Sequence, residues 1–320
     1  MMLDKWMEIL DMGGAIDVVC FDFMKAFDKV PHSGLIVKLR SYGIGGPLLA
    51  WIREFLSNRK QRVVVNGEKS EWAEVTSGVP QGSVLGPLLF VIFINDLPEV
   101  IDSGSSLYMF ADDTKLFREI SSTSDRDTLQ CDINDMDNWS DIWQMSYHPS
   151  KCHVLRIGKR PVEDTHDLFE SYKLGGLSLD VVDNEKDLGV LIEADLSFNK
   201  HVSTKVKNAN RTLGLIRRSF RFLDKEMLLD LYKSLVRPLL EYANQVWSPR
   251  LVKHIDMLEN VQIRAVKLIP GFDKSKARRQ HERQTGSGKA KDYDRLKEYQ
   301  ENLTKLKLPT LAYRRLRGIL

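Results

Sequence analysis

The first part of the chain alternates short apolar runs with turn-forming residues, which predicts a mixture of strands and helices. The β-branched run from Ile16 to Phe23 predicts a buried strand that ends at Asp22. Helices are predicted after Pro31, up to about residue 42, and after Gly45-Gly46-Pro47. The turn signal Asn66-Gly67 lies between two extended stretches and predicts a hairpin over 61–75.

The pattern stays mixed as far as about residue 195. A loop rich in turn formers, residues 77–83, leads into an apolar helix over 84–97. Two short strands, 105–111 and 114–120, flank Asp112-Asp113. The elements predicted after them are a helix over 124–146, a strand over 152–157, a hairpin over 173–179 and a strand over 187–191.

From about residue 198 the apolar spacing becomes helical throughout. Pro238 and Pro249 are expected to kink or end helices there. The predicted helices cover 199–221, 224–246, 251–268, 292–305 and 309–318. The fold class is therefore α+β over the first domain, residues 1–195, followed by an all-helical second domain, residues 196–320. A basic segment near 274–292 is predicted to be a mobile insertion in the second domain.

Charge is distributed unevenly although the net charge of the 320-residue chain is only +3. Residues 112–141 carry nine acids and three bases, whereas residues 200–218 carry six bases and no acid. Residues 274–297 carry nine bases and three acids. This separation favours a polyanionic partner held near a metal site, and the alternative is that solvated helix faces happen to segregate by charge.

Three cysteines form no disulfide framework and have no metal-binding spacing, which fits a reducing, intracellular setting. The N-terminal dozen residues carry four charges and do not read as a signal peptide. The most apolar run, residues 84–97, is too short to span a bilayer. We therefore expect a protein of the nucleus, the cytoplasm or both, with no transmembrane segment and no secretion.

Three aspartates carry the candidate chemistry. Asp112 and Asp113 sit at the tip of a predicted hairpin, and Asp22 ends a predicted strand far upstream. Adjacent carboxylates repel each other, and a cation offsets that repulsion. If the strands adjoin in one sheet, the three carboxylates can hold two divalent ions for phosphoryl transfer. The alternative is that Asp112-Asp113 is only a polar turn.

Three ordered motifs resemble those of reverse transcriptases from non-LTR retrotransposons. They are Phe21-Asp22-Phe23-Met24-Lys25-Ala26-Phe27-Asp28, Ser77-Gly78-Val79-Pro80-Gln81-Gly82-Ser83 and Phe110-Ala111-Asp112-Asp113. Residues 184–190 and the run Val236-Arg237-Pro238-Leu239-Leu240-Glu241-Tyr242 resemble the jockey-type branch of that family. The resemblance covers nearly all of the chain from about Asp17, apart from residues 274–292.

The resemblance implies a polymerase palm, made of an antiparallel sheet with packed helices and partial fingers, followed by an all-helical thumb. The implied activity is RNA-directed DNA polymerase, with an RNA template, a DNA primer and deoxynucleoside triphosphates as partners. Asp22, Asp112 and Asp113 would be catalytic metal ligands for two Mg²⁺ ions, which Mn²⁺ could replace. Lys151 would be a general acid that protonates the leaving pyrophosphate.

The resemblance also implies binding residues. Phe27 would exclude a 2′-hydroxyl, and a core role for this aromatic is the alternative. The residues expected to line the nucleotide pocket are Phe23, Phe27, Pro80, Gln81, Gly82 and Ala111. The residues expected to hold the primer–template duplex are Lys205, Lys207, Arg211, Arg217 and Arg218.

The chain also departs from the family pattern. Nothing before Asp17 supplies the upstream fingers or an endonuclease domain, so we expect a truncated copy with weak or no activity alone. A partner could supply the fingers or the endonuclease, and the sequence does not fix the oligomeric state. One alternative is a non-catalytic nucleic-acid-binding relic. A less favoured one is an RNA-dependent RNA polymerase, against which Ala111 and the bulky Phe27 argue.

Overall fold

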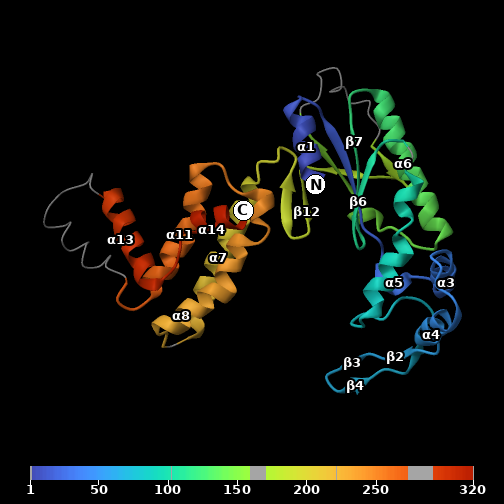
Figure 1. Ribbon diagram of the computed structural model, residues 1–320, viewed down its shortest axis with the longest axis horizontal. Helices are drawn as coiled ribbons and strands as arrows, with labels where there is room; N and C mark the ends of the chain where they lie inside the picture. The colour runs from blue at the N-terminus through green and yellow to red at the C-terminus, as the bar shows by residue number, and fades with distance from the viewer. Residues whose placement is uncertain (1, 102, 159–170, 221, 273–290, 320) are drawn as a thin grey trace. The chain divides into compact units, whose positions relative to one another are not determined.

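The computed structural model describes residues 2–101, 103–158, 171–220, 222–272 and 291–319. Contacts within the chain divide it into two compact units, Met1–Asn184 and Glu185–Leu320 (Figure 1). The sequence predicts this boundary at residue 195, eleven positions later. The boundary comes earlier because a hairpin over 184–193 is tied to the first long helix of the second unit.

The first unit is built on a five-stranded sheet with the strand order β11-β8-β1-β7-β6. The central strand β1 pairs antiparallel with β7 on one side and with β8 on the other. Strand β6 pairs antiparallel with β7, and β11 runs parallel to β8. The strands are β1 (Ile16–Phe21), β6 (Ser106–Phe110), β7 (Asp113–Glu119), β8 (His153–Ile157) and β11 (Asp180–Val182). Sequence patterns predict all of them except β11.

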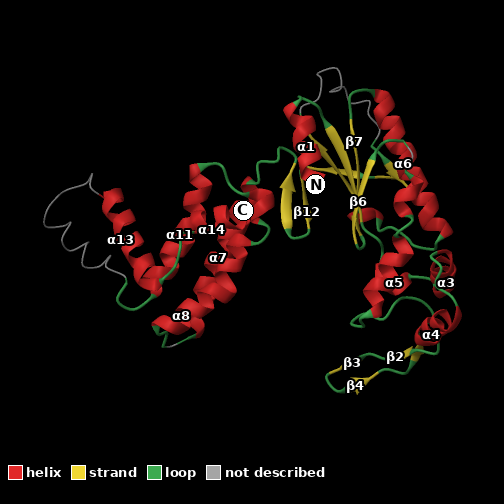
Figure 2. Cartoon of the chain, in the orientation of Figure 1, coloured by secondary structure: helices red, strands yellow, loops and turns green. Residues whose placement is uncertain are grey.

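Helices cover both faces of this sheet, which explains why every residue of β1 is buried (Figure 2). Val19 and Phe21 belong to the main apolar core with side chains of helices α5 and α6. Trp6 of helix α1 packs edge-on against Phe117 of β7, with ring centroids 5.7 Å apart. The helices of this unit are α1 (Met2–Asp11), α2 (Ala26–Lys29), α3 (His32–Ser41), α4 (Gly46–Leu56), α5 (Leu85–Ile94) and α6 (Thr123–Ile142), with short 3₁₀ turns η1 (Leu97–Val100) and η2 (Pro149–Lys151).

A buried lysine joins three of these helices. Lys38 of α3 donates hydrogen bonds to the Phe93 carbonyl at 2.5 Å and to Asp96 at 2.6 Å. Its ammonium also lies 3.8 Å from the ring centroid of Trp143 and 4.4 Å from that of Trp139. Burial lowers the pKa of Lys38 to about 8, although Asp96 acts in the opposite direction. The cation therefore exchanges water for aromatic faces and one carboxylate.

The predicted hairpin over 61–75 forms a two-stranded ribbon that extends from helix α4 (Figure 1). Its strands are β2 (Lys60–Gln61), β3 (Val64–Val65), β4 (Glu68–Lys69) and β5 (Ala73–Glu74). The turn is Asn66-Gly67, as predicted, and both residues have positive φ. A second predicted hairpin is present as β9 (Lys173–Leu174) and β10 (Leu177–Ser178).

In its described residues, the second unit consists of one hairpin and a set of helices. Its elements are β12 (Asn184–Asp187), β13 (Val190–Glu193), α7 (Asn199–Ser219), α8 (Lys225–Leu231), α9 (Arg237–Glu241), α10 (Asn244–Trp247), α11 (Val252–Leu268), α13 (Lys291–Leu306) and α14 (Leu311–Ile319). The single strand predicted over 187–191 is wrong. Leu188 and Gly189 have positive φ and form the turn between β12 and β13.

The predicted helix over 224–246 is broken into shorter pieces. A π-helical turn, Tyr232–Val236, separates α8 from α9 and directly precedes Arg237-Pro238. Proline has no backbone N–H to donate, so the helix cannot keep its ordinary hydrogen-bond register there. Ala243, with φ +52, ends the next piece before α10. The prediction that Pro238 interrupts the helix is confirmed.

The predicted mobile insertion near 274–292 lies almost entirely outside the described residues. None of the helices in the described ranges combines the length and the apolar character that crossing a membrane requires.

Candidate functional site

Strand pairing sets the position of Asp22. Phe21, the last residue of β1, pairs with Thr114 of β7. Continuing this antiparallel register by one residue sets Asp22 opposite Asp113. In the β6–β7 hairpin Phe110 pairs with Asp113, which leaves Ala111 and Asp112 as the two-residue turn. The three aspartates predicted as catalytic therefore come from adjoining strands at one end of the sheet.

The hairpin turn holds a strained backbone. Ala111 has φ +53, a left-handed conformation that favours glycine and costs another residue roughly 1 kcal/mol. Asp112 is half-buried and Asp113 is exposed at this tip. Strain of this kind is concentrated at functional sites, where the surrounding structure holds it in place.

A third segment lies beside Asp22 on the β8 side. The Met24 amide donates to the Ser146 carbonyl and the His148 amide donates to the Asp22 carbonyl, each at 2.8 Å. This pairing brings Lys151 to the site, where its Nζ lies 3.4 Å from Asp22 Oδ1. The two side chains are 58% and 38% exposed, so the ion pair is largely solvated. Lys151 is thus next to a candidate metal ligand, while its role as a general acid stays a prediction.

Sequence reasoning missed two residues of this segment. The Asp22 amide donates to Cys152 Sγ at 3.4 Å, and burial raises the pKa of the Cys152 thiol to about 11. His148 Nδ1 lies 3.0 Å from the Ser150 hydroxyl. No local signal could have identified them, because Asp22 and Cys152 are 130 residues apart and meet only through the pairing of β1 with β8.

The loop of the second motif packs directly on the segment that follows Asp22. The Gly78 amide donates to the Val30 carbonyl and the Val79 amide donates to the Phe27 carbonyl, each at 2.8 Å. Gly78 has φ +86, and a Cβ at this position would lie 2.6 Å from the Asp28 carbonyl oxygen. Only glycine fits there, since backbone atoms occupy the space of a side chain.

The same loop presents polar groups to solvent. Gln81 Nε2 donates to Asp28 Oδ1 at 2.9 Å, and both residues are exposed. Gly82 is exposed with φ +82, and a Cβ added to it would have nothing within 4 Å. Pro80 is half-buried, and its carbonyl accepts a hydrogen bond from the Ser83 hydroxyl at 2.7 Å. The predicted nucleotide-pocket residues of this loop are therefore accessible beside the first motif.

Two phenylalanines of the first motif differ in accessibility. Phe27 is half-buried and stacks on Phe90 of α5, with ring centroids 4.4 Å apart. Phe23 is only 3% exposed and stacks on Tyr147. The Phe23 side chain is therefore part of the core between sheet and helices. Its predicted place at the nucleotide pocket stays a prediction.

The three aspartates suit a hard divalent cation in the chemistry of their donor atoms, because Mg²⁺ prefers carboxylate oxygens. Within the described residues, no three His, Cys, Asp or Glu side chains are gathered as a preformed metal site. Asp22 instead has the Lys151 ammonium beside one carboxylate oxygen. The carboxylate oxygens are therefore of the type that Mg²⁺ binds, but they are not gathered into a preformed site.

Four of the five basic residues predicted to bind nucleic acid are exposed on α7: Lys207, Arg211, Arg217 and Arg218. Helical spacing sets Lys207, Arg211 and Arg218 on the side opposite the buried side chains. These buried side chains include Val202, Ala209 and Leu213. The helix therefore presents a row of cations to solvent.

Lys205 does not belong to this row. It is half-buried, its Nζ donates to the Gly189 carbonyl at 3.0 Å, and it lies 5.7 Å from the Tyr242 ring centroid. Burial lowers its pKa. Lys205 anchors the β12–β13 turn to α7 by this hydrogen bond, and its contact with nucleic acid stays a prediction.

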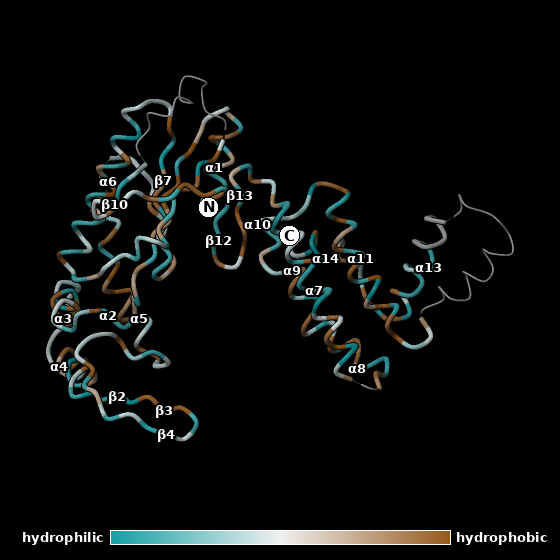
Figure 3. Tube along the Cα trace, turned by 180° about the vertical axis from the view of Figure 1, so that it is seen from behind, coloured by the Kyte–Doolittle hydropathy of each residue, from teal (hydrophilic) through white to brown (hydrophobic). Residues whose placement is uncertain are grey.

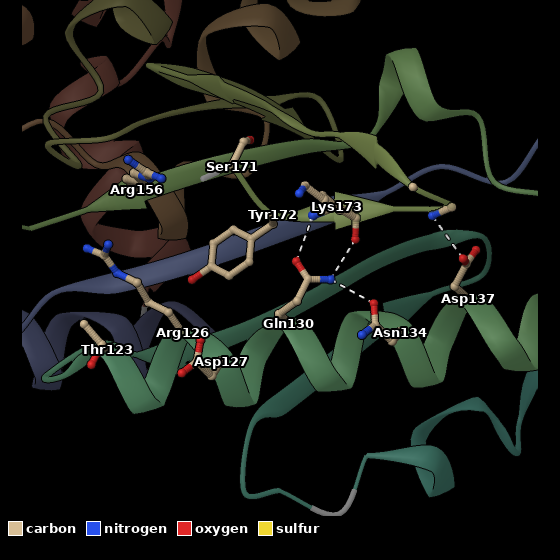
Figure 4. A pocket seen from close by; sticks show the side chains of 12 residues that line it. Thr123, Arg126, Asp127, Gln130, Asn134, Asp137, Arg156, Ser171, Tyr172 and Lys173 are labelled. Carbon is tan, nitrogen blue, oxygen red and sulfur yellow. Dashed lines mark hydrogen bonds between the residues drawn. The ribbon is translucent and has the colours of Figure 1, made fainter. Parts of the chain in front are cut away.

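A polar cavity of about 620 Å³ lies elsewhere in the first unit, between α6 and the β9 region (Figure 4). Its lining includes Tyr172, whose hydroxyl donates to the buried carboxylate of Asp17 at 2.8 Å. Asp17 is near the start of β1, whereas Asp22 follows its end. The cavity is therefore at the opposite end of the strand from the three aspartates.

Comparison with known proteins identifies the family of this chain. The model of the family "Reverse transcriptase (RNA-dependent DNA polymerase)" matches residues 7–223. The RNA-directed DNA polymerase from mobile element jockey of Drosophila melanogaster is 28% identical over 262 residues, which cover 78% of this chain and 28% of the relative. A probable RNA-directed DNA polymerase from transposon BS of the same species is 26% identical over 327 residues, covering 94% of this chain and 35% of the relative.

Among solved structures, telomerase from Candida tropicalis in complex with a telomeric RNA fragment aligns with 95% of this chain and 46% of its own. The TM-score is 0.45 at 10% identity. The chain spans little more than a quarter of the jockey protein, at 28% of its length. The family match includes all three motifs, and the resemblance to reverse transcriptases of non-LTR retrotransposons is confirmed. With its α+β palm and helical thumb, the chain belongs to the reverse transcriptase (RNA-dependent DNA polymerase) family.

Proposed function

We propose that this chain carries the polymerase centre of an RNA-directed DNA polymerase. It adds deoxynucleotides to the 3′-hydroxyl of a DNA primer on an RNA template. One observation carries the proposal: the register of β1 with β7 sets Asp22 opposite Asp113, at the tip that also bears Asp112. A family match over residues 7–223 supports the same reaction.

Asp22, Asp112 and Asp113 would hold two Mg²⁺ ions, for which Mn²⁺ is a substitute. When bound, such ions stabilise the charge on the attacking and leaving oxygens of phosphoryl transfer. The protein's own contribution is to keep three carboxylates at one end of the sheet. Asp22 directly follows β1, which pairs with β7 and β8, and its carbonyl accepts a hydrogen bond from the His148 amide, so its backbone is positioned before any ligand arrives.

The loop over 77–83 would form the nucleotide pocket with the first motif. Gln81 can exchange its hydrogen bond with Asp28 for one to the incoming nucleotide, since it has both a donor and an acceptor. Phe27 is fixed by stacking on Phe90, so its ring has a constant position from which to exclude a 2′-hydroxyl. Lys151 would donate a proton to the leaving pyrophosphate.

The exposed cations of α7 would contact the phosphates of the primer–template duplex. Along the helix axis, Lys207 and Arg211 are about 6 Å apart, and Arg211 and Arg218 about 10 Å apart. Such a row can follow a phosphate backbone without reading its sequence. Binding by this surface is expected to weaken steeply with added salt.

Primer extension tests the proposal. The chain is given an RNA template, a DNA primer, deoxynucleotides and Mg²⁺, beside the double variant Asp112→Asn/Asp113→Asn. Asp135→Asn is the matched control, because Asp135 is an exposed aspartate of α6 away from the site. Extension by the wild type and the control, but not by the double variant, is expected. Equal extension by all three proteins would refute the assignment. Retained duplex binding with no extension by any of them would favour the non-catalytic relic.

A further inference from the structure

The β2–β5 ribbon of the first unit exposes apolar and aromatic side chains that ordinarily seek a partner. Every residue of its four strands is exposed. Figure 3 shows that β3 is one of its most hydrophobic stretches. Val63 is 66% exposed and Trp72 is 57% exposed. A two-stranded ribbon alone is marginally stable in water, so a surface of this kind is expected to bind something.

The strand pairing sorts these side chains onto two faces. Lys60 pairs with Glu74 in one short ladder, and Val64 pairs with Lys69 in the other. Between them the Arg62 guanidinium lies 4.5 Å from the Trp72 ring centroid, as expected for neighbours on one face. One extra residue of the returning strand separates the two ladders, which is the arrangement of a β-bulge.

Because side chains alternate along a strand, the two faces differ in chemistry. We call one the cationic face: Lys60, Arg62, Val64, Lys69, Trp72 and Glu74. We call the other the valine face: Gln61, Val63, Val65, Glu68, Ser70 and Ala73. The cationic face has three bases, one acid and an exposed indole. The valine face has a single charge, Glu68, and the extra residue of the bulge, Glu71, is an exposed acid that the pairing assigns to neither face.

We propose that the cationic face binds single-stranded nucleic acid. A base stacks on the exposed indole of Trp72, while Lys60, Arg62 and Lys69 lie next to the phosphates. Aromatic rings among basic side chains are the usual platform for single strands, because every base offers a π face and every nucleotide a negative charge. Arg62 already covers part of the Trp72 ring, which holds the indole in place and adds a cation to the platform.

Other occupants fit this face less well. A duplex hides the faces of its bases, so Trp72 could not stack on one. A second copy of the chain packed face to face would bring three cations against three cations, which is repulsive. The valine face is a separate surface, and a protein partner there would leave the cationic face free. The inference rests on the proposed function in one respect: an RNA-directed DNA polymerase has a single-stranded template as its substrate.

Fluorescence anisotropy of the full chain tests the proposal. The probes are a labelled 20-nucleotide single-stranded RNA, a single-stranded DNA of the same sequence and the corresponding duplex, with EDTA and without nucleotides. Trp72→Leu is expected to weaken binding of both single strands about tenfold, with no change for the duplex. Its salt dependence stays unchanged because no charge is removed. Circular dichroism checks that each variant remains folded.

The cations are tested separately. Lys60→Gln/Arg62→Gln/Lys69→Gln is expected to reduce the slope of log affinity against log salt by about 2, at roughly 0.7 per phosphate contact. Val63→Thr is the control, since Val63 is an exposed side chain of the same ribbon, like Trp72, but lies on the valine face. It should bind every probe as the wild type does.

Two results would overturn the inference. The first is that Trp72→Leu and Lys60→Gln/Arg62→Gln/Lys69→Gln both bind single strands as tightly as the wild type does. The other is self-association in sedimentation that Trp72→Leu abolishes, together with unchanged nucleic-acid binding. The polymerase assignment is tested independently, because Asp112→Asn/Asp113→Asn should stop extension and leave Trp72-dependent binding intact.

Discussion

Replacement of Gly78 by alanine tests the contact between the first motif, residues 21–28, and the second motif, residues 77–83. Gly78 has φ +86, and an added Cβ would lie 2.6 Å from the Asp28 carbonyl oxygen and 2.7 Å from its Cα. Those are backbone atoms, which cannot turn aside as the end of a long side chain can. The loop must move away from the first motif, and the hydrogen bond from the Gly78 amide to the Val30 carbonyl must stretch.

A matched control separates the contact from the backbone conformation. Gly82, in the same loop, has φ +82, but nothing lies within 4 Å of its added Cβ. An alanine in this conformation costs roughly 1 kcal/mol, partly offset by about 0.5 kcal/mol of lost unfolded-state entropy. Gly78→Ala adds overpacking of about 1–3 kcal/mol and weakens a backbone hydrogen bond worth about 1 kcal/mol. The expected difference between the two variants is about 3 kcal/mol.

Urea unfolding followed by tryptophan fluorescence measures this difference. Five of the six tryptophans precede residue 185, so the signal reports mainly on the first unit. With a slope of about 2 kcal/mol per molar urea, the midpoint of Gly78→Ala should lie roughly 1.5 M below that of Gly82→Ala. Midpoints that agree within about 0.3 M would show that the loop does not depend on this close approach, and the reasoning would be wrong.

Three further outcomes follow from the charged side chains. Lys151→Gln should slow nucleotide incorporation about 100-fold in single-turnover kinetics, and Lys151→Arg should restore little, if the lysine is a general acid. Lys207→Gln/Arg211→Gln should lower the salt dependence of duplex binding by about 2, whereas Lys205→Gln should instead raise hydrogen exchange in the β12–β13 hairpin. The lowered pKa of Lys38, about 8 against 10.5 for a free lysine, means that only the unfolded chain holds this proton between those values. The free energy of unfolding should therefore rise from about pH 8 to about pH 10 in urea titrations, and Lys38→Met should remove that rise.

Local signals located the strands and the turn that carry the candidate site, because these elements are encoded in consecutive positions. The run before Asp22 has the composition of a buried strand, and Asp112-Asp113 lies between two strand patterns, so both elements could be located from the sequence. The residues that surround Asp22 in the fold could not be predicted from the sequence. The segment with His148 and Cys152 reaches it through pairing of β1 with β8, and nothing in either segment encodes its partner.

The sequence patterns also did not predict which side chains of the motifs are buried. Phe23 and Phe27 are four residues apart in one motif, yet Phe23 lies in the core and Phe27 is half-buried on α2. Lys205 is a charged residue of a type common on exposed helix faces, but its Nζ donates a hydrogen bond to the Gly189 carbonyl in the β12–β13 turn. In each case a contact from a distant part of the chain determines what the side chain touches, and the local sequence does not encode that contact.

The structure also explains why Asp22 and the hairpin aspartates differ in how firmly their backbones are held. Asp22 directly follows the central strand β1, its carbonyl accepts from the His148 amide and its own amide donates to Cys152 Sγ, so its backbone has little freedom. Asp112 is in a two-residue turn at a strained Ala111, where only one hairpin restrains it. Like charges at such a tip favour separation until a cation offsets them. Adjustment at the site should therefore come from the hairpin, while the central strand provides the fixed reference against which it moves.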